Sequence, residues 1–189
     1  MDLRWLIPLV IGFAFNLASA FTGLYSRWWG PRTGQLATVL LRNVLGIPVW
    51  VLGLIAATRT PSAALFHPAT LLRVVAWLLM AFASLLQLWA LAALRQRAAA
   101  PALGDTLVEQ GPYRHVRHPI YVGLILDFVA VVILQARVAV LGACALGLVW
   151  TILQARAEEI DLLRRVPGYR EYMMRVSAFW PRASARGAA

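Results

Sequence analysis

The residues best suited to chemistry lie in one short stretch, Gly-Pro-Tyr-Arg-His-Val-Arg-His-Pro-Ile-Tyr-Val-Gly, at positions 111–123. Proline disfavours helix at the residue before it and suits the first helical turn, so we expect His118 to precede a helix that begins at Pro119. A helix start offers unpaired backbone N–H groups and the positive end of a dipole, which bind a carboxylate. Because Arg114 and Arg117 would add cationic donors, the stretch predicts a site for an anionic group.

Two aromatic side chains, Tyr113 and Tyr121, flank the same stretch. Aromatic faces attract cations, so a ligand with a carboxylate, an aromatic base and a positive sulfonium would find partners for all three groups. The alternative is a loop at the membrane interface whose arginines meet lipid phosphates and whose tyrosines join an aromatic belt. His115 and His118 could instead bind a metal, but catalytic zinc usually has three protein ligands, and we expect no metal.

A second charged cluster, Arg156-Ala157-Glu158-Glu159 followed by Asp161, comes at the end of the last apolar segment. Carboxylates at membrane depth are unfavourable and usually have a function or a partner. One glutamate could hydrogen-bond a ligand's amino group or sugar hydroxyls. Alternatively, these are helix-end charges that pair with Arg156, Arg164 or Arg165.

The composition indicates that a lipid bilayer surrounds the elements that position these clusters. Of the 189 residues, 61% are hydrophobic and 14% are charged, and the mean hydropathy is +0.69, whereas a soluble domain carries about 25% charged residues. The formal net charge is +10 and all 18 basic residues are arginine. They lie between apolar stretches and not on one polar face, which argues against nucleic-acid binding. With a single cysteine, Cys144, no disulfide framework is expected.

The apolar segments predict an all-α membrane fold with about five transmembrane helices. A span needs about 20 mainly apolar residues, and the segments of that length are 5–25, 36–57 and 71–93. Residues 120–134 and 138–153 are shorter and close together, which predicts a short helical hairpin that spans the bilayer or dips into it. A signal-peptidase site at residues 18–20 is an alternative for the first segment, although the apolar stretch is long for a signal peptide.

The C-terminal tail predicts two short helices broken at Pro167-Gly168. Apolar residues of the second helix recur at i, i+3, i+4 and i+7, namely Tyr169, Tyr172, Met173 and Val176. This spacing predicts an amphipathic helix on the membrane interface, with Phe179 and Trp180 as anchors at headgroup depth.

Arginine asymmetry predicts the orientation of the spans. With five crossings, one side carries four arginines and the other thirteen, so we expect the N-terminus outside and the C-terminus in the cytoplasm. Residues 95–119 and 154–189 then share the cytoplasmic side, where they can meet. Arg42 remains inside the second span, and we expect Asp127 of the fourth helix to form a buried pair with Arg42 or Asn43.

The two clusters together resemble the isoprenylcysteine carboxyl methyltransferase family and the related phospholipid methyltransferases. The shared pattern is a G-x-Y-x-x-x-R-H-P-x-Y loop, a helical hairpin, paired glutamates and a G-Y-x-x-Y tail that ends near proline. The matching residues are Gly111, Tyr113, Arg117-His118-Pro119, Tyr121, Glu158-Glu159, Gly168-Tyr169, Tyr172 and Pro181. The similarity covers about residues 95–182, and the first three spans match only in general character.

The resemblance implies an integral membrane methyltransferase that uses S-adenosyl-L-methionine. It implies that the cofactor pocket is formed, partly through backbone, by Asp105, Thr106, Leu107, Val108, Tyr113, His118, Pro119, Ile120, Tyr121, Glu158 and Glu159. Family enzymes hold substrate with an arginine shortly before the glutamates, and Arg156 is the candidate here. The acceptor would be lipophilic and would reach the enzyme from the bilayer, as a carboxylate, thiol, amine or phospholipid headgroup.

These inferences divide the chain into two expected regions. Residues 1–94 would form three transmembrane helices that act as a scaffold and give access to substrate, and residues 95–189 would form the cofactor-binding catalytic region. One alternative is a membrane sterol-type reductase with a nicotinamide cofactor, whose phosphates would need more cations than Arg114 and Arg117. The other is a non-catalytic membrane protein with an open pore, in which Asp127 would face water.

Overall fold

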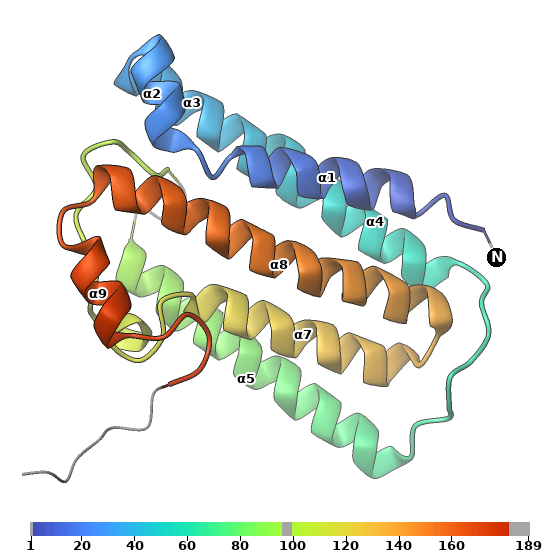
Figure 1. The fold of residues 1–189 in the computed structure, drawn as a ribbon. Helices are drawn as coiled ribbons and strands as arrows, with labels where there is room; N and C mark the ends of the chain where they lie inside the picture. Colours follow the sequence, from blue (N-terminus) through green and yellow to red (C-terminus); the bar gives the residue numbers. More distant parts are fainter. Residues whose placement is uncertain (1, 96–99, 182–189) are drawn as a thin grey trace, which may run out of the picture.

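The computed structural model describes residues 2–95 and 100–181, which form a helical bundle (Figure 1). The end of the expected catalytic region, residues 182–189, and its residues 96–99 lie outside the described residues. The elements are α1 (Leu6–Ala18), α2 (Thr22–Trp29), α3 (Pro31–Val39), η1 (Leu40–Gly46), α4 (Ile47–Arg59), α5 (Thr70–Leu94), η2 (Gly111–Arg114), α7 (Pro119–Gln135), α8 (Val138–Arg165) and α9 (Tyr169–Arg175). Of these, η1 is a π-helical stretch and η2 is a 3₁₀ turn.

The helices have the length and the exposed apolar surface of an integral membrane protein. Three described segments are long and apolar enough to cross a membrane: Pro31–Arg59, α5 and α8. The pair α1 and α2, bent by 65°, qualifies as a fourth, broken span, and the apolar helix α7 has 17 residues, near the lower limit for a crossing. Large apolar side chains of α5, among them Leu78 and Leu85, are exposed, as contact with lipid requires.

The first predicted span is broken where two side-chain hydroxyl groups donate to backbone carbonyls. Ser19 Oγ donates to the carbonyl of Asn16 at 2.6 Å, and Tyr25 Oη donates to the carbonyl of Ala18 at 2.9 Å. Local side-chain bonds of this kind offer the backbone an alternative to the helical ladder. The chain therefore bends between α1 and α2 and does not continue straight through residues 5–25.

The predicted short hairpin is wrong in its second half. Helix α8 has 28 residues and continues past position 153 to Arg165, because residues 154–165 are mostly good helix formers whose buried members, such as Gln154 and Asp161, face the bundle. The expected first helix of the tail is therefore the end of α8. The predicted break at Pro167-Gly168 is confirmed, since Gly168 has φ of 79° and separates α8 from α9.

Helix α8 lies between two helical pairs (Figure 1). On one side α1 packs on α4 so closely that a Cβ on Gly12 would lie 2.2 Å from the backbone nitrogen of Trp50, the close approach that small residues allow in membrane helices. On the other side α7 packs along α5. Helices α4 and α5 are not packed extensively against each other in the described part of the chain, and the faces between them remain available to a cavity.

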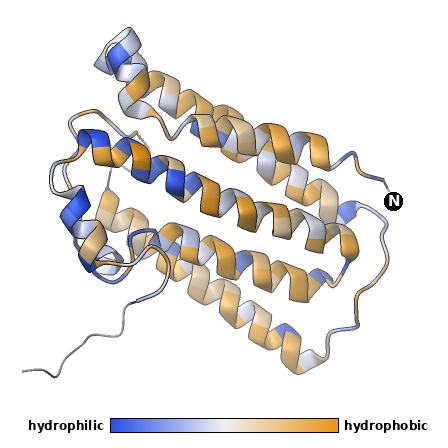
Figure 2. Cartoon of the chain, in the orientation of Figure 1, coloured by the Kyte–Doolittle hydropathy of each residue, from blue (hydrophilic) through white to orange (hydrophobic). Residues whose placement is uncertain are grey.

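Hydrophilic residues gather at the end of the bundle that carries α9 (Figure 2). The predicted apolar stripe of α9 is present but does not lie on the membrane interface: Tyr169, Tyr172 and Val176 are buried in a cluster with Val166. The stripe faces protein because the chain turns back at Gly168 onto the end of α8. Trp180 is 74% exposed, and its role as a membrane anchor stays a prediction.

Candidate active site at the polar end of the bundle

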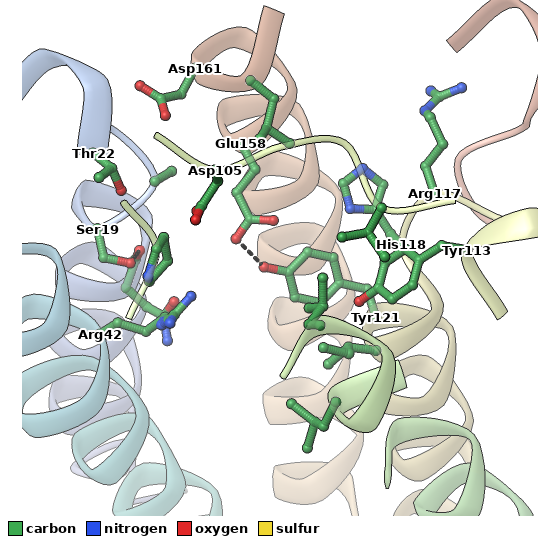
Figure 3. A pocket seen from close by; sticks show the side chains of 18 of the residues that line it. Ser19, Thr22, Arg42, Asp105, Tyr113, Arg117, His118, Tyr121, Glu158 and Asp161 are labelled. Atoms are coloured by element: carbon green, nitrogen blue, oxygen red, sulfur yellow. Dashed lines mark hydrogen bonds between the residues drawn. The ribbon is translucent and has the colours of Figure 1, made fainter. Parts of the chain in front are cut away.

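A cavity of about 760 Å³ lies at the polar end of the bundle (Figure 3). One wall, the N-terminal wall, consists of residues from α1, α2, η1 and α4, including Ser19, Thr22 and Arg42. The opposite wall, the C-terminal wall, consists of residues from the 101–118 segment, α7, α8 and α9. The volume is within the range of about 300–1,000 Å³ that is usual for small-molecule sites.

Glu158 presents its carboxylate at the centre of the C-terminal wall. Tyr121 Oη donates to Glu158 Oε1 at 2.5 Å, and Gln154 Nε2 donates to the same oxygen at 3.1 Å. Because both bonds within the described residues go to Oε1, Oε2 is available as an acceptor for a ligand. Glu158 is therefore held in place by the protein while keeping hydrogen-bonding capacity toward the cavity.

Glu159, the next residue, is engaged by the protein alone. Its Oε1 accepts hydrogen bonds from Arg117 Nε at 2.9 Å and Arg117 Nη2 at 2.7 Å, and lies 3.1 Å from His118 Nε2. Arg117 also donates to the carbonyls of Met173 and Val176. Arg117 was expected to bind a ligand's anion, but its guanidinium instead joins three parts of the chain. Consecutive helical residues lie about 100° apart, which explains why the two glutamates face different partners.

A second arginine, Arg165, fixes the opposite edge of the same wall. Its Nε donates to Asp161 Oδ2 at 2.6 Å, and its Nη1 donates to the carbonyl of Ala102 at 2.7 Å and lies 3.4 Å from Asp105 Oδ2. Asp161 Oδ1 in turn accepts from the backbone N–H of Gly23 at 2.9 Å. This clamp was not expected to position the site, although the i, i+4 spacing of Asp161 and Arg165 predicts their pairing.

Aromatic rings surround the N-terminal end of α7. Tyr113 is buried, and burial, with the charge of Glu158 as the next cause, raises the pKa of its hydroxyl well above the ordinary value. The hydroxyl therefore stays protonated at physiological pH. The rings of His118 and Tyr121 are stacked with centroids 5.5 Å apart, and the ring of Phe179 packs against the imidazole at a tilt, with centroids 5.8 Å apart.

The structure brings most of the predicted site residues together around the cavity. Those that line it are Asp105, Thr106, Leu107, Val108, Tyr113, His118, Ile120, Tyr121 and Glu158. Pro119 is fully buried at the start of α7, as predicted from the sequence, and Glu159 is held by Arg117, so neither is among the lining residues. Arg156 and Arg114 are exposed and lie outside the cavity lining. Arg156 precedes Glu158 by two positions, about 200° around the helix.

Two further expectations concern acidic and basic residues inside the spans. Asp127 is paired with neither Arg42 nor Asn43: its Oδ2 accepts from Gln87 Nε2 at 2.6 Å, because α7 packs against α5. Arg42 Nε donates to Asn43 Oδ1 at 3.3 Å, and both residues line the cavity. The site residues of the N-terminal wall were not predicted from the sequence. Arg42, a basic residue inside an apolar span, was the feature that indicated a polar site there.

The fold and the cavity define a class of protein: a helical membrane protein with a cavity, lined by polar and apolar side chains, at one end of its spans. Residues 71–168 match the family model of the phospholipid methyltransferases. The chain belongs to this family, which confirms the resemblance seen in its motifs, and it is a membrane methyltransferase. No curated protein and no solved structure matches it in the comparisons.

Proposed function

We propose that this protein transfers a methyl group from S-adenosyl-L-methionine to a lipophilic acceptor that carries a carboxylate, thiol, amine or phospholipid headgroup. One observation carries the proposal: the segment from Asp105 to His118 and the glutamate Glu158 line the same cavity, although they are distant in sequence. The family supplies the reaction class. The rest follows from the chemistry of the lining residues.

The donor set of the C-terminal wall suits this cofactor. Glu158 can accept hydrogen bonds from an amino group or ribose hydroxyls, and the faces of Tyr113 and Tyr121 suit a positively charged sulfur. Arg117 and Arg165 are both engaged with buried carboxylates. A dinucleotide with several phosphates would therefore find few cations on this wall, which speaks against the nicotinamide alternative.

The bound cofactor would supply a methyl group already activated by the positive charge on sulfur. What the protein must add is alignment of the acceptor with that methyl group, an effect that contributes up to about 7–11 kcal/mol in well-oriented reactions. The ion pairs of Arg117 with Glu159 and of Arg165 with Asp161 and the 101–118 segment hold Glu158 and that segment in fixed relative positions. An amine acceptor would also need a proton acceptor, whereas a carboxylate or thiolate would not.

The proposal retains the division of the chain into two regions. Residues 95–189 would bind the cofactor, and residues 1–94 would present the acceptor, since Arg42 and Trp50 line the cavity from that side. We further propose that the end of the bundle with α9 faces the cytoplasm, as the arginine distribution indicates. Labelling of single cysteines introduced at Ser62 and Glu171 in intact cells tests this. Labelling at Glu171→Cys from the outside would contradict the orientation.

Calorimetric titration of the purified protein with S-adenosylhomocysteine tests the cofactor. We expect saturable binding, reduced about tenfold or more by Glu158→Gln, because a charged hydrogen-bond acceptor is lost, and reduced by His118→Ala. Glu171→Gln, at an exposed acid of α9, is the matched control and should bind like the parent. An absence of heat with the parent protein would overturn the proposal, and unchanged affinity in Glu158→Gln would overturn the site.

A further inference from the structure

Asp127 is an acid in the middle of the apolar helix α7 and is not among the residues that line the cavity. Its Oδ2 accepts a hydrogen bond from Gln87 Nε2 of α5 at 2.6 Å, whereas its Oδ1 is buried without a donor among the described residues. A buried acceptor without a donor is unfavourable by about 1–3 kcal/mol, and acids inside a span are usually functional. Stability alone therefore gives no reason for an acid at this position.

Gly123 leaves the space through which the Gln87 side chain reaches this carboxylate. It precedes Asp127 by four positions and so lies on the same face of α7. A Cβ at position 123 would lie 2.5 Å from Gln87 Cγ and 2.9 Å from Gln87 Nε2. Because any side chain larger than hydrogen would push the amide away from Asp127, the close contact of α5 with α7 at this point depends on the glycine.

The hydrogen bond to Asp127 fixes the orientation of the Gln87 amide. A carboxylate can only accept hydrogen bonds, so the amide nitrogen must face Asp127, and the carbonyl oxygen Oε1 lies on the other branch of the side chain. Oε1 accepts no hydrogen bond from the described residues. Without the carboxylate the amide could turn over and exchange the places of its donor and its acceptor.

Gln87, unlike Asp127, lines the cavity. The lining residues next to it on the two helices, Leu91 of α5 and Leu124 of α7, are apolar. In such surroundings a hydrogen bond is stronger than in water, and a polar atom left without a partner is more unfavourable. A free carbonyl oxygen at this place therefore favours a ligand that brings a hydrogen-bond donor over one that does not.

We propose that Gln87 is a specificity determinant for the methyl acceptor and that Asp127 is its positioning residue. Gln87 Oε1 accepts a hydrogen bond from an N–H or O–H group of the acceptor molecule, and Asp127 holds the amide in the orientation that this bond requires. The inference rests on the proposed function, because it concerns recognition of the acceptor in the same cavity. It implies that Asp127 acts only through Gln87.

The first test uses two pairs of probes in which a methyl group replaces the donor hydrogen: hexadecanol with its methyl ether, and N-methylhexadecanamide with N,N-dimethylhexadecanamide. Binding to the purified full-length protein in nanodiscs is measured with S-adenosylhomocysteine present. We expect the donor-bearing member of at least one pair to bind about three- to tenfold more tightly, as one neutral hydrogen bond provides. Gln87→Met should abolish this preference. Gln135→Met, at an exposed glutamine of α7 outside the cavity lining, is the matched control and should retain it.

The second test measures whether Asp127 acts through Gln87. Asp127→Ala releases the amide, and Asp127→Asn lets it turn over because an asparagine can donate as well as accept, so both should remove most of the preference for donor-bearing probes. In the Gln87→Met background, Asp127→Ala should change probe binding no further, since two residues that act as one give a non-additive double-mutant cycle. Gly123→Ala, which displaces the amide, should resemble Asp127→Ala.

Two outcomes would overturn the inference: equal binding within both probe pairs in the parent protein, or additive effects of Asp127→Ala and Gln87→Met, which a merely structural contact would give. Titration with S-adenosylhomocysteine separates this failure from failure of the proposed function. If Gln87→Met loses the preference while its affinity for S-adenosylhomocysteine is unchanged, the inference is supported. If the parent protein prefers the donor-bearing probes but does not bind S-adenosylhomocysteine, the proposed cofactor is wrong and the role of Gln87 stands.

Discussion

The two walls of the cavity satisfy their polar groups in different ways. In the C-terminal wall, Arg117 and Arg165 pair with carboxylates, and the side chains of these arginines are only 9% and 8% exposed. In the N-terminal wall, Trp50 of α4 keeps an indole N–H group for which the described residues offer no acceptor. The arginines of the first wall are thus held by the fold itself, whereas Trp50 of the second wall keeps a donor that a ligand can satisfy.

Removing the buried arginine Arg117 from the C-terminal wall should have the largest effect, a loss of stability. Arg117→Ala leaves Glu159 buried without its cation, and breaking a buried pair in this way lowers the free energy of unfolding by about 3–5 kcal/mol. Arg42→Ala should lower it by less, since Arg42 is only partly buried. Unfolding in mixed micelles with increasing dodecyl sulfate measures both, with exposed Arg114→Ala as control. Similar losses in Arg117→Ala and Arg42→Ala would remove the distinction between the walls.

Helices α1 and α4 are packed so tightly that a single added methyl group should shift the N-terminal wall without shifting the C-terminal wall. A Cβ on Gly53 would lie 2.5 Å from the backbone nitrogen of Leu9, so Gly53→Ala must separate the two helices, at about 1–3 kcal/mol of stability. We expect weaker binding of the lipophilic probe hexadecanol with unchanged affinity for S-adenosylhomocysteine. Equal losses in both affinities would show that the two walls move as one.

Loss of one hydrogen bond to Glu158 should have a smaller and local effect. Tyr121→Phe removes the donor at 2.5 Å from Glu158 Oε1, and a hydrogen bond to a charged group contributes about 1.5–3 kcal/mol. Part of this loss is recovered by Gln154, so we expect S-adenosylhomocysteine to bind about tenfold more weakly. Tyr25→Phe, which removes a hydroxyl bonded to a backbone carbonyl outside the site, should leave the titration unchanged.

The smallest predicted effect is a loss of stability in alkali. Burial, followed by the charge of Glu159, raises the pKa of Tyr169 in the folded protein, whereas the unfolded chain loses this proton near pH 10. Above about pH 10 the unfolded state binds fewer protons, so the free energy of unfolding falls as the pH rises. Between about pH 8 and pH 10.5, Tyr169→Phe should reduce this fall by up to about 1 kcal/mol. An identical fall in both proteins would contradict the assignment.

Much of the fold followed from hydrophobicity and proline placement. The third span, predicted at residues 71–93, is helix α5 (Thr70–Leu94), and the start of α7 at Pro119 was read correctly. The length of α8 was missed because its last turns are charged. Hydropathy alone does not distinguish polar residues in solvent from polar residues, such as Asp161, that are buried against partners from distant segments.

The motifs located one wall of the site and not the other. Ordered spacing around His118 and Glu158 identified the C-terminal wall, but spacing did not reveal that Arg117 is engaged by Glu159, since that pairing depends on how the 101–118 segment folds over α8. The N-terminal wall depends on the packing of α1, η1 and α4 around the cavity. No local pattern encodes that packing, and Arg42 was the one visible signal.

The π-helical stretch Leu40–Gly46 also determines how the side chains of α3 are rotated about the helix axis relative to those of α4. One residue corresponds to about 100° of rotation in an α-helix. Deletion of a single residue after Arg42, for example Leu45, would allow an ordinary α-helix to form and would swing every side chain upstream of it around the axis. The guanidinium would then point away from Tyr121, although its chemistry and its depth in the bilayer would hardly change.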